Sequence, residues 1–201
     1  MTFVYIAVEG DTDIPVAERL IKHVGLEPLP AITARSAAKL DQRFTKLNRS
    51  GRALNWLVLR DLDAVACAPE LLDKLLAGVA LSERVCVRVP VREIESWLLA
   101  DVEGFAAAFS VRPSRMIASP DELNDPKRHV VEVCRHSRSR AVRDTVPPRP
   151  GSGRSVGAEY ASRISDFARR SWNIESAAPR SPSLARALSA LRSRVARGVW
   201  R

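Results

Sequence analysis

Unbroken apolar runs alternate with amphipathic segments through the first half of the chain. Residues 3–8, FVYIAV, are β-branched and aromatic throughout, which is typical of a strand buried on both faces of a parallel sheet. Apolar runs at residues 30–34, 55–60 and 84–89 predict three more strands. The segments between them, and residues 93–109 after the last run, have helical spacing with Pro, Gly and capping residues at their ends. The pattern predicts an α/β fold with a mainly parallel, Rossmann-like sheet flanked by helices.

The pattern changes after about residue 110, where short helical segments between turns replace the strands. Residues 145–155, TVPPRPGSGRS, are typical of an exposed loop. Residues 156–172 and 181–200 have apolar side chains at helical spacing and predict two amphipathic helices. The sequence therefore predicts an α/β core at residues 1–110 and an arginine-rich, mostly helical extension at 111–201 that packs on this core.

Positive charge is concentrated in the second half of the chain. The net charge is +9, yet residues 1–101 hold 13 Lys and Arg against 14 Asp and Glu, whereas residues 102–201 hold 19 against 9. Arginine supplies nearly all of the excess, and its guanidinium group binds phosphate bidentately, so we expect a nucleic-acid partner, DNA or RNA. A solvated arginine-rich surface without a partner is the alternative. The candidate nucleic-acid-binding residues are Arg128, Arg135, Arg138, Arg140, Arg143 and Arg154.

Membrane insertion and disulfide chemistry find no support in the sequence. No apolar stretch approaches the roughly 20 residues that span a bilayer, and the first ten residues lack the basic region of a signal peptide. Cys67, Cys86 and Cys134 are odd in number and have no CxxC spacing, so we expect free thiols. The sequence predicts a cytoplasmic protein without a membrane partner.

Acidic residues follow three of the predicted strands at the point where each strand ends. Glu9 follows the first strand, Asp61 and Asp63 follow the third, and Glu93 and Glu95 follow the fourth. Ligands of parallel α/β sheets bind outside the carboxyl ends of the strands. Residues two apart in an extended chain point the same way, so each Asp or Glu pair can project together. We therefore expect these carboxylates to gather at one edge of the sheet.

Clustered carboxylates repel one another unless a cation lies between them. Ligand sets made only of oxygen select hard cations, so the cluster predicts one or two Mg²⁺ or Mn²⁺ ions. Two such ions can activate a water and stabilise the leaving oxygen of a phosphodiester. Simpler interpretations stay open: Asp61 and Asp63 can cap a helix, and Glu93 and Glu95 suit the first turn of a helix because of its dipole.

Two segments, VYIAVEGDTD at 4–13 and LVLRDLD at 57–63, resemble the Toprim domain of topoisomerases, DnaG-type primases and OLD (overcoming lysogenisation defect) nucleases. The sequence looks most similar to the OLD type and to small stand-alone bacterial Toprim-like proteins, some of them suspected in phage defence. The resemblance implies a metal ligand or general base at Glu9 and Mg²⁺ ligands at Asp61 and Asp63. OLD-type domains add acidic ligands whose places here are Asp13 and the Glu93–Glu95 segment.

OLD-type nucleases also use a lysine that stabilises the transition state. Lys127 in NDPKRHV is the candidate by resemblance, and Arg154 in the GSGRS loop is the alternative. The resemblance thus implies a Mg²⁺- or Mn²⁺-dependent nuclease in phage defence or DNA repair. The alternative is a non-catalytic Toprim-like binding or regulatory subunit. OLD-type domains commonly work with an ATPase, so an ATPase partner or a homodimer is a further expectation.

Overall fold

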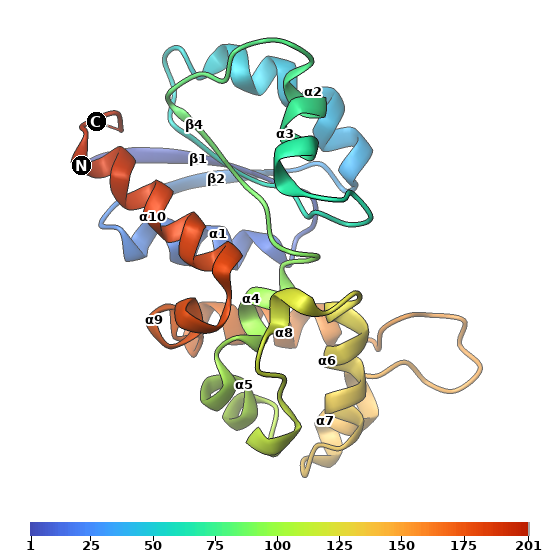
Figure 1. Ribbon diagram of the computed structural model, residues 1–201. Coiled ribbons are helices and arrows are strands. Elements are labelled where there is room, and N and C mark those ends of the chain that lie inside the picture. Colours follow the sequence, from blue (N-terminus) through green and yellow to red (C-terminus); the bar gives the residue numbers. More distant parts are fainter. Residues whose placement is uncertain (201) are drawn as a thin grey trace. The chain divides into compact units, whose positions relative to one another are not determined.

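The protein, here in a computed structural model that describes residues 1–200, forms two compact units (Figure 1). The first unit contains Met1–Pro90 and the described residues from Ala185 onward, and the second contains Val91–Leu184. The change in sequence pattern suggests a boundary near residue 110, but the structure groups the chain differently. The segment after the fourth strand already belongs to the second unit, and the C-terminal helix belongs to the first.

Four parallel strands in the order β2-β1-β3-β4 form the sheet of the first unit (Figure 1). The central strands β1 and β3 pair directly, with Tyr5 opposite Trp56 and Ala7 opposite Val58. Most side chains of these two strands are buried, because helices cover both faces of the sheet. The α/β class with a parallel sheet is therefore confirmed. The strands are β1 (Phe3–Val8), β2 (Glu27–Thr33), β3 (Trp56–Leu59) and β4 (Val85–Arg88).

The helices of the first unit lie on both faces of the sheet. Right-handed crossovers in this strand order put α1 on one face and α2 and α3 on the other, and α10 lies on the same face as α1 (Figure 1). On the first face, Nη2 of Arg192 in α10 lies 3.2 Å from Nε2 of His23 at the end of α1. These helices are α1 (Asp13–His23), α2 (Ala37–Ser50), α3 (Ala68–Leu76) and α10 (Pro182–Ala196), the last belonging to this unit from Ala185 onward.

Both edges of the sheet are protected against further strand pairing. In β2 the N–H of Glu27 points toward β1, so position 28 faces outward before the register shifts. Pro28 occupies it and Pro30 follows in the same strand, and proline has no N–H to donate. At the other edge, the Val85 carbonyl of β4 accepts a hydrogen bond from Nη2 of Arg194 in α10 at 3.0 Å. One edge is blocked by proline and the other by a helix side chain.

The second unit is built of helices and 3₁₀ turns around two buried indole rings. Trp97 donates through Nε1 to Oγ of Ser183 at 2.6 Å, and Trp172 donates to the carbonyl of Trp97 at 3.2 Å. Phe105 and Phe167, both buried in this unit, pack edge to face with ring centroids 5.5 Å apart. The helices are α4 (Glu95–Leu99), α5 (Val102–Ala108), α6 (Pro126–Arg135), α7 (Arg140–Thr145), α8 (Tyr160–Arg170) and α9 (Ile174–Ala177), with 3₁₀ turns at η1 (Pro113–Arg115), η2 (Pro120–Glu122) and η3 (Ala178–Arg180).

The single helix predicted at residues 93–109 is two helices in the structure. The break lies at Asp101, whose carboxylate accepts the Gly104 N–H at 3.2 Å and so caps the start of α5. A capping aspartate inside an apolar run therefore marks the end of one helix and the start of the next. No helix among the described residues is both long enough and apolar enough to cross a bilayer.

Gly51 directly follows α2 and lies close to β4, so a substitution at Gly51 tests how α2 packs against the sheet. A Cβ atom on Gly51 would lie 2.4 Å from Cγ2 of Val85 in β4. We expect Gly51→Ala to lower the free energy of unfolding by about 1–3 kcal/mol, because β4 must shift to admit the methyl group. Urea denaturation measures the change, with exposed Arg52→Ala as a control expected within about 0.5 kcal/mol of wild type. A Gly51→Ala protein as stable as wild type would contradict this packing.

Candidate functional site

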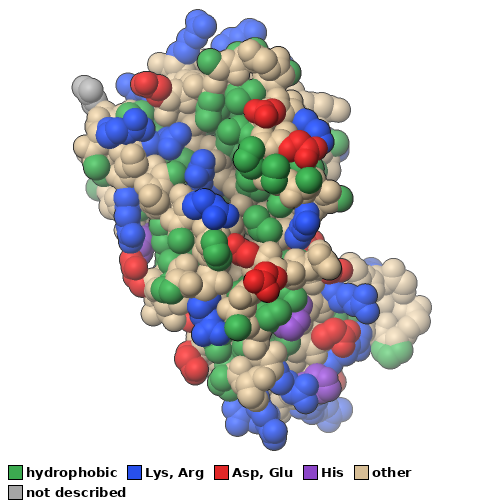
Figure 2. Space-filling model, viewed as in Figure 1, with side chains coloured by type: hydrophobic (Ala, Val, Ile, Leu, Met, Phe, Trp, Pro, Cys, Tyr) green, Lys and Arg blue, Asp and Glu red, His purple; other side chains and the backbone are tan. Residues whose placement is uncertain are grey.

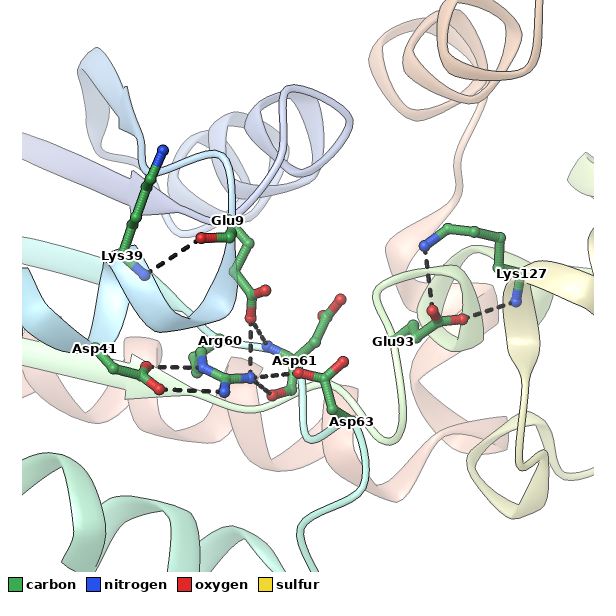
Figure 3. A network of polar contacts seen from close by, with 9 residues as sticks. Glu9, Lys39, Asp41, Arg60, Asp61, Asp63, Glu93 and Lys127 are labelled. Atoms are coloured by element: carbon green, nitrogen blue, oxygen red, sulfur yellow. Dashed lines mark hydrogen bonds and ion pairs between the residues drawn. The ribbon is translucent and has the colours of Figure 1, made fainter. Parts of the chain in front are cut away.

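A network of ion pairs centred on Arg60 lies at the carboxyl end of the sheet (Figure 3). Arg60 directly follows β3 and is only 5% exposed. Its Nη1 donates to Oε1 of Glu9 at 3.0 Å and to Oδ2 of Asp63 at 2.8 Å. Its Nε and Nη2 donate to the two carboxylate oxygens of Asp41 at 2.9 and 3.3 Å. One guanidinium thus joins carboxylates from the end of β1, from α2 and from the loop after β3.

Glu9 and the Asp61–Asp63 loop meet because β1 and β3 are neighbouring parallel strands. Oε1 of Glu9 accepts the backbone N–H of Asp61 at 2.9 Å. The chain is not extended past β3, as the sequence suggested, because Asp63 adopts a left-handed conformation with φ of 50°. Aspartate tolerates this region better than most residues. The resulting turn returns the Asp63 carboxylate to Arg60 instead of projecting it alongside Asp61.

Asp13, predicted as a further metal ligand, lies at the start of α1 and is 6% exposed. Its Oδ2 accepts the Gly10 N–H at 2.8 Å, and its Oδ1 accepts the Thr12 hydroxyl at 3.3 Å. These contacts fix the turn that connects β1 to α1. Asp13 therefore has a structural role at the beginning of the helix as well as a place near Glu9.

The pKa of Glu9 is raised from 4.5 to about 7. Burial of the carboxyl group is the largest cause; Arg60 opposes it, and the negative charges of Asp63 and Asp13 add to it. Burial thus outweighs the effect of the Arg60 guanidinium on the pKa of Glu9. A second cation near Glu9 would favour the ionised carboxylate.

The second unit contains its own buried carboxylate cluster, around Lys127 (Figure 3). The backbone N–H of Lys127 donates to Oε2 of Glu93 at 2.9 Å, and its Nζ lies 3.1 Å from the other oxygen. The same Nζ lies 3.7 Å from Oε1 of Glu95, which also accepts the Tyr160 hydroxyl at 2.8 Å. Within this unit the structure thus brings together three residues that the sequence singled out, Lys127, Glu93 and Glu95. Their proposed catalytic and metal-binding roles stay predictions.

Glu95 is the most deeply buried carboxylate of this cluster, at 1% exposure. Its Oε2 is buried without a hydrogen-bond partner. Burial raises its pKa, while the ammonium group of Lys127 opposes that shift. Tyr160 also has a raised pKa, caused first by burial and then by the Glu95 charge. Sequence analysis missed Tyr160, because its spacing in α8 is that of an ordinary apolar contact.

The predicted nucleic-acid-binding arginines are exposed, but they do not form an isolated basic surface. Arg135 pairs with Glu132 at 3.4 Å, and Arg140 pairs with Asp144 at 3.2 Å. The second unit holds 15 Lys and Arg against 12 Asp and Glu, so its excess is small. Figure 2 shows Lys and Arg side chains interspersed with acidic and apolar ones on the face in view. The exposed predicted residues are Arg128, Arg135, Arg138, Arg140, Arg143 and Arg154.

The carboxylate set of the first unit matches a hard cation in its chemistry, although Arg60 holds part of it. Glu9, Asp61 and Asp63 offer only oxygen donors, the ligands that Mg²⁺ and Mn²⁺ prefer. Across residues 1–200, no three His, Cys, Asp or Glu side chains are placed as ligands of one metal ion. Oε1 of Glu9 and Oδ2 of Asp63 point to Nη1 of Arg60 instead. Metal binding here requires these side chains to reorient.

The raised pKa of Glu9 predicts a pH-dependent stability of the metal-free protein. Between about pH 4.5 and 7 the folded state binds more protons at Glu9 than the unfolded state, so stability falls as pH rises through this window. In wild type, this titration should change the free energy of unfolding by about 1–2 kcal/mol across the window, and Glu9→Gln should remove that change. The value is smaller than the full pKa shift would give, because the carboxylate keeps some contact with water. Urea denaturation at pH 5 and pH 8 in a chelator measures it. Identical pH dependence in both proteins would refute the assignment.

The Lys127 cluster predicts a destabilisation that grows with pH. Lys127→Met removes the ammonium group beside the buried Glu95 carboxylate, and we expect a loss of about 1–3 kcal/mol at pH 8. The loss should be smaller at pH 5, because protonation of Glu95 removes its unbalanced charge. Lys74→Met, which breaks an exposed ion pair with Glu70, is the matched control. Equal losses at both pH values would contradict this interpretation of the cluster.

Comparisons with known proteins leave the two clusters as the main guide to function. A scan against family models, a search of curated proteins and a search of solved structures each found no significant match to this chain. The Toprim resemblance thus stays a hypothesis based on two short motifs. The geometry at the ends of β1 and β3 is the observation from which the chemistry of this chain must be inferred.

Proposed function

We propose that this chain is a metal-dependent phosphodiesterase that cleaves nucleic acid, with its metal site at the carboxyl ends of β1 and β3. The observation that carries the proposal is the meeting of Glu9 with the Asp61–Asp63 loop, where Oε1 of Glu9 lies 2.9 Å from the Asp61 nitrogen. Two adjacent parallel strands deliver these carboxylates to the edge where α/β folds bind ligands. Their order and spacing are also those that the Toprim resemblance implies.

Glu9, Asp61 and Asp63 would hold Mg²⁺ or Mn²⁺. The bound ion would supply Lewis acidity toward a phosphate oxygen and lower the pKa of a water molecule. Glu9 comes from a different strand than the two aspartates, so it can fix the ion from a second direction or take a proton as general base. Asp13 holds the β1–α1 turn through the Gly10 N–H and so keeps the Glu9 backbone in place.

A nucleic acid is the substrate class that the charge of the chain favours. The protein has a net charge of +9, and residues 185–200 alone hold four arginines and no acidic residue. Arginine contacts to phosphate give affinity without reading sequence, so we expect cleavage with little sequence preference and a strong salt dependence. Cys67, Cys86 and Cys134 are all free thiols, which fits the cytoplasm as the site of action.

Arg60 favours a second candidate function, a non-catalytic Toprim-like module. The guanidinium already provides a cation to Glu9, Asp41 and Asp63. In this alternative the ion pairs stabilise the fold where a metal would otherwise be bound, and a partner such as an ATPase or a nuclease carries the activity. The two candidates differ in one measurable property, the affinity of the isolated chain for divalent cations.

The decisive experiment measures metal binding and cleavage on the same samples. Mn²⁺ and Mg²⁺ are titrated calorimetrically into wild type and into Asp61→Ala/Asp63→Ala, and each sample is then assayed on single- and double-stranded DNA and RNA. We expect the double variant to lose metal binding and to lose cleavage by about 100-fold or more, because both effects need the same carboxylates.

The matched control is Asp73→Ala/Glu83→Ala, which removes two exposed carboxylates from the same unit. It should bind metal and cleave as wild type does. Metal binding without cleavage of any substrate would favour the module that needs a partner. Cleavage that survives in Asp61→Ala/Asp63→Ala would refute the proposed site.

A further inference from the structure

Positively charged side chains lie along β4 and α10 in the first unit (Figure 2). Val85 of β4 faces Gly51 at the end of α2. The alternate side chains of Cys86 and Arg88 therefore point to the other face of the sheet, on which α10 lies (Figure 1). Arginines of β4 and of the C-terminal segment thus share one face. The arginine strip consists of Arg88, Arg186, Arg194 and Arg197.

Two guanidinium groups of the strip are held by backbone carbonyls. Nη1 of Arg88 donates to the carbonyl of Arg186 at 3.5 Å, and Nη2 of Arg194 donates to the carbonyl of Val85 at 3.0 Å. Burial raises the pKa of the Cys86 thiol, and the charges of Arg88 and Arg194 both oppose that shift, so both lie near this thiol. A carbonyl carries no net charge, and these hydrogen bonds therefore fix the guanidinium groups without neutralising them.

The strip has no acidic partners. Within residues 1–200, none of its four arginines forms an ion pair with an Asp or Glu side chain. Arg135 and Arg140 of the second unit do form such pairs. Arg186 and Arg197 are exposed, and residues 185–200 contain no acidic residue. The strip is therefore a surface of uncompensated positive charge, which attracts a polyanion.

The arginines of the strip follow β4 along its length. Arg186 lies beside Arg88 at one end of the strand, and Arg194 lies beside Val85 at the other, so α10 runs antiparallel to β4. The Arg197 N–H donates to the carbonyl of residue 193, which continues the helical path. Positions 186, 194 and 197 of such a path lie within roughly 80° of one another, over a length of about 16 Å.

One end of the strip reaches the carboxyl edge of the sheet. Arg88 is the last residue of β4 and lies opposite Leu59 of β3. Its carbonyl accepts the N–H of Arg60 at 3.1 Å, directly beside the loop that meets Glu9. A polymer that lies on the strip is therefore led to the edge where the candidate site is found.

The strip fits the outside of a DNA duplex better than other nucleic acids. A duplex carries one charge per roughly 1.7 Å, so about 16 Å of strip faces about nine charges. Single strands are bound by stacking of bases on exposed rings, but the ring beside the strip, Trp200, is 3% exposed and covered by Arg194. Proteins that bind duplex RNA span two successive minor grooves, about 16 base pairs, which is longer than the strip.

We infer that the arginine strip binds the phosphate backbone of duplex DNA and directs the duplex to the carboxyl edge of the sheet. The inference deepens the proposed function and rests on it, because that function supplies nucleic acid as the substrate class. Arg186 and Arg197 contact phosphates, while Arg88 and Arg194 add positive charge from fixed positions. The binding surface is thus in the first unit, whereas the sequence alone placed it on arginines of the second. Binding needs no metal ion and reads no base sequence.

The test is binding of a fluorescein-labelled 20-base-pair DNA duplex, measured by anisotropy in EDTA so that no metal-dependent cleavage occurs. Arg186→Gln/Arg197→Gln should lower the affinity by about tenfold or more at about 0.1 M salt, because two phosphate contacts are lost. A plot of log affinity against log salt concentration should also become less steep by about 2. Both side chains are exposed, so the variant should fold as wild type does. Unchanged affinity and slope would overturn the inference.

Two matched variants separate the position of the charge from its amount. Arg43→Gln/Arg49→Gln removes two exposed arginines from α2, on the opposite face of the same sheet, and should bind DNA within about threefold of wild type. Arg186→Lys/Arg197→Lys keeps the charge of the strip and should also stay within about threefold. A loss in the α2 variant as large as in the Gln variant of the strip would show that only the total charge matters, and would overturn the inference.

The other surfaces and ligands are tested in the same assay. A greater loss in Arg128→Gln/Arg138→Gln than in Arg186→Gln/Arg197→Gln would place binding on the second unit and overturn the strip. Tighter binding of single-stranded DNA or of duplex RNA than of duplex DNA would overturn the ligand assigned to it.

The outcomes also separate this inference from the proposed function. Strip-dependent binding in EDTA, without cleavage by wild type in Mg²⁺ or Mn²⁺, would support the strip and overturn the nuclease. Cleavage that needs Asp61 and Asp63, with equal DNA affinity in wild type and Arg186→Gln/Arg197→Gln, would overturn the strip alone. Neither binding nor cleavage would overturn both proposals.

A measurement on wild type tests the strip without any substitution. Phenylglyoxal modifies exposed arginines, and mass spectrometry of the digested protein reports the extent at each one. Saturating duplex DNA in EDTA should slow modification of Arg186 and Arg197 by about fivefold or more, because bound phosphates cover them. Arg43 and Arg49, exposed on α2, should react at the same rate with and without DNA. Equal protection of both pairs would overturn the assignment of the surface.

Discussion

The buried guanidinium of Arg60 is the contact on which the carboxyl edge of the sheet depends. It pairs with Glu9, Asp41 and Asp63, three carboxylates drawn from three segments of the first unit. Removing one partner of a buried ion pair typically costs about 3–5 kcal/mol, more than the pair contributes as a whole. The ion pairs of Arg60 therefore add little net stability. Their main effect is to fix the positions of the β1–α1 turn, α2 and the loop after β3.

The second unit also pairs carboxylates with a cationic side chain, but it uses different groups. There the ammonium of Lys127 lies against Glu93 and Glu95, and the Tyr160 hydroxyl shares Oε1 of Glu95. Lysine presents a compact charge and bonds its neighbours one by one, whereas arginine imposes a planar fork. In each unit, carboxylates thus gather around one cationic side chain. Removal of that side chain would change both the local charge and the local packing.

Sequence pattern predicted the sheet well because burial on both faces leaves unbroken apolar runs, as at residues 3–8. It also placed Glu9, Asp61 and Asp63 at one edge, because strand ends in a parallel sheet coincide. It missed Arg60, although an arginine at the end of a buried run is itself a signal of a paired charge. The partner could not be predicted, because Asp41 is an ordinary helix residue until the fold brings α2 to β3.

The two edges of the sheet become protected at different times. Pro28 and Pro30 block β2 by their covalent structure, so the block exists as soon as this segment is synthesised. The Val85 carbonyl of β4 is covered only after α10, near the end of the chain, has folded back. Parallel sheets form slowly because their strands are distant in sequence. The growing chain is therefore exposed to aggregation mainly through β4, and a truncation that removes Arg194 would uncover that edge in the finished protein as well.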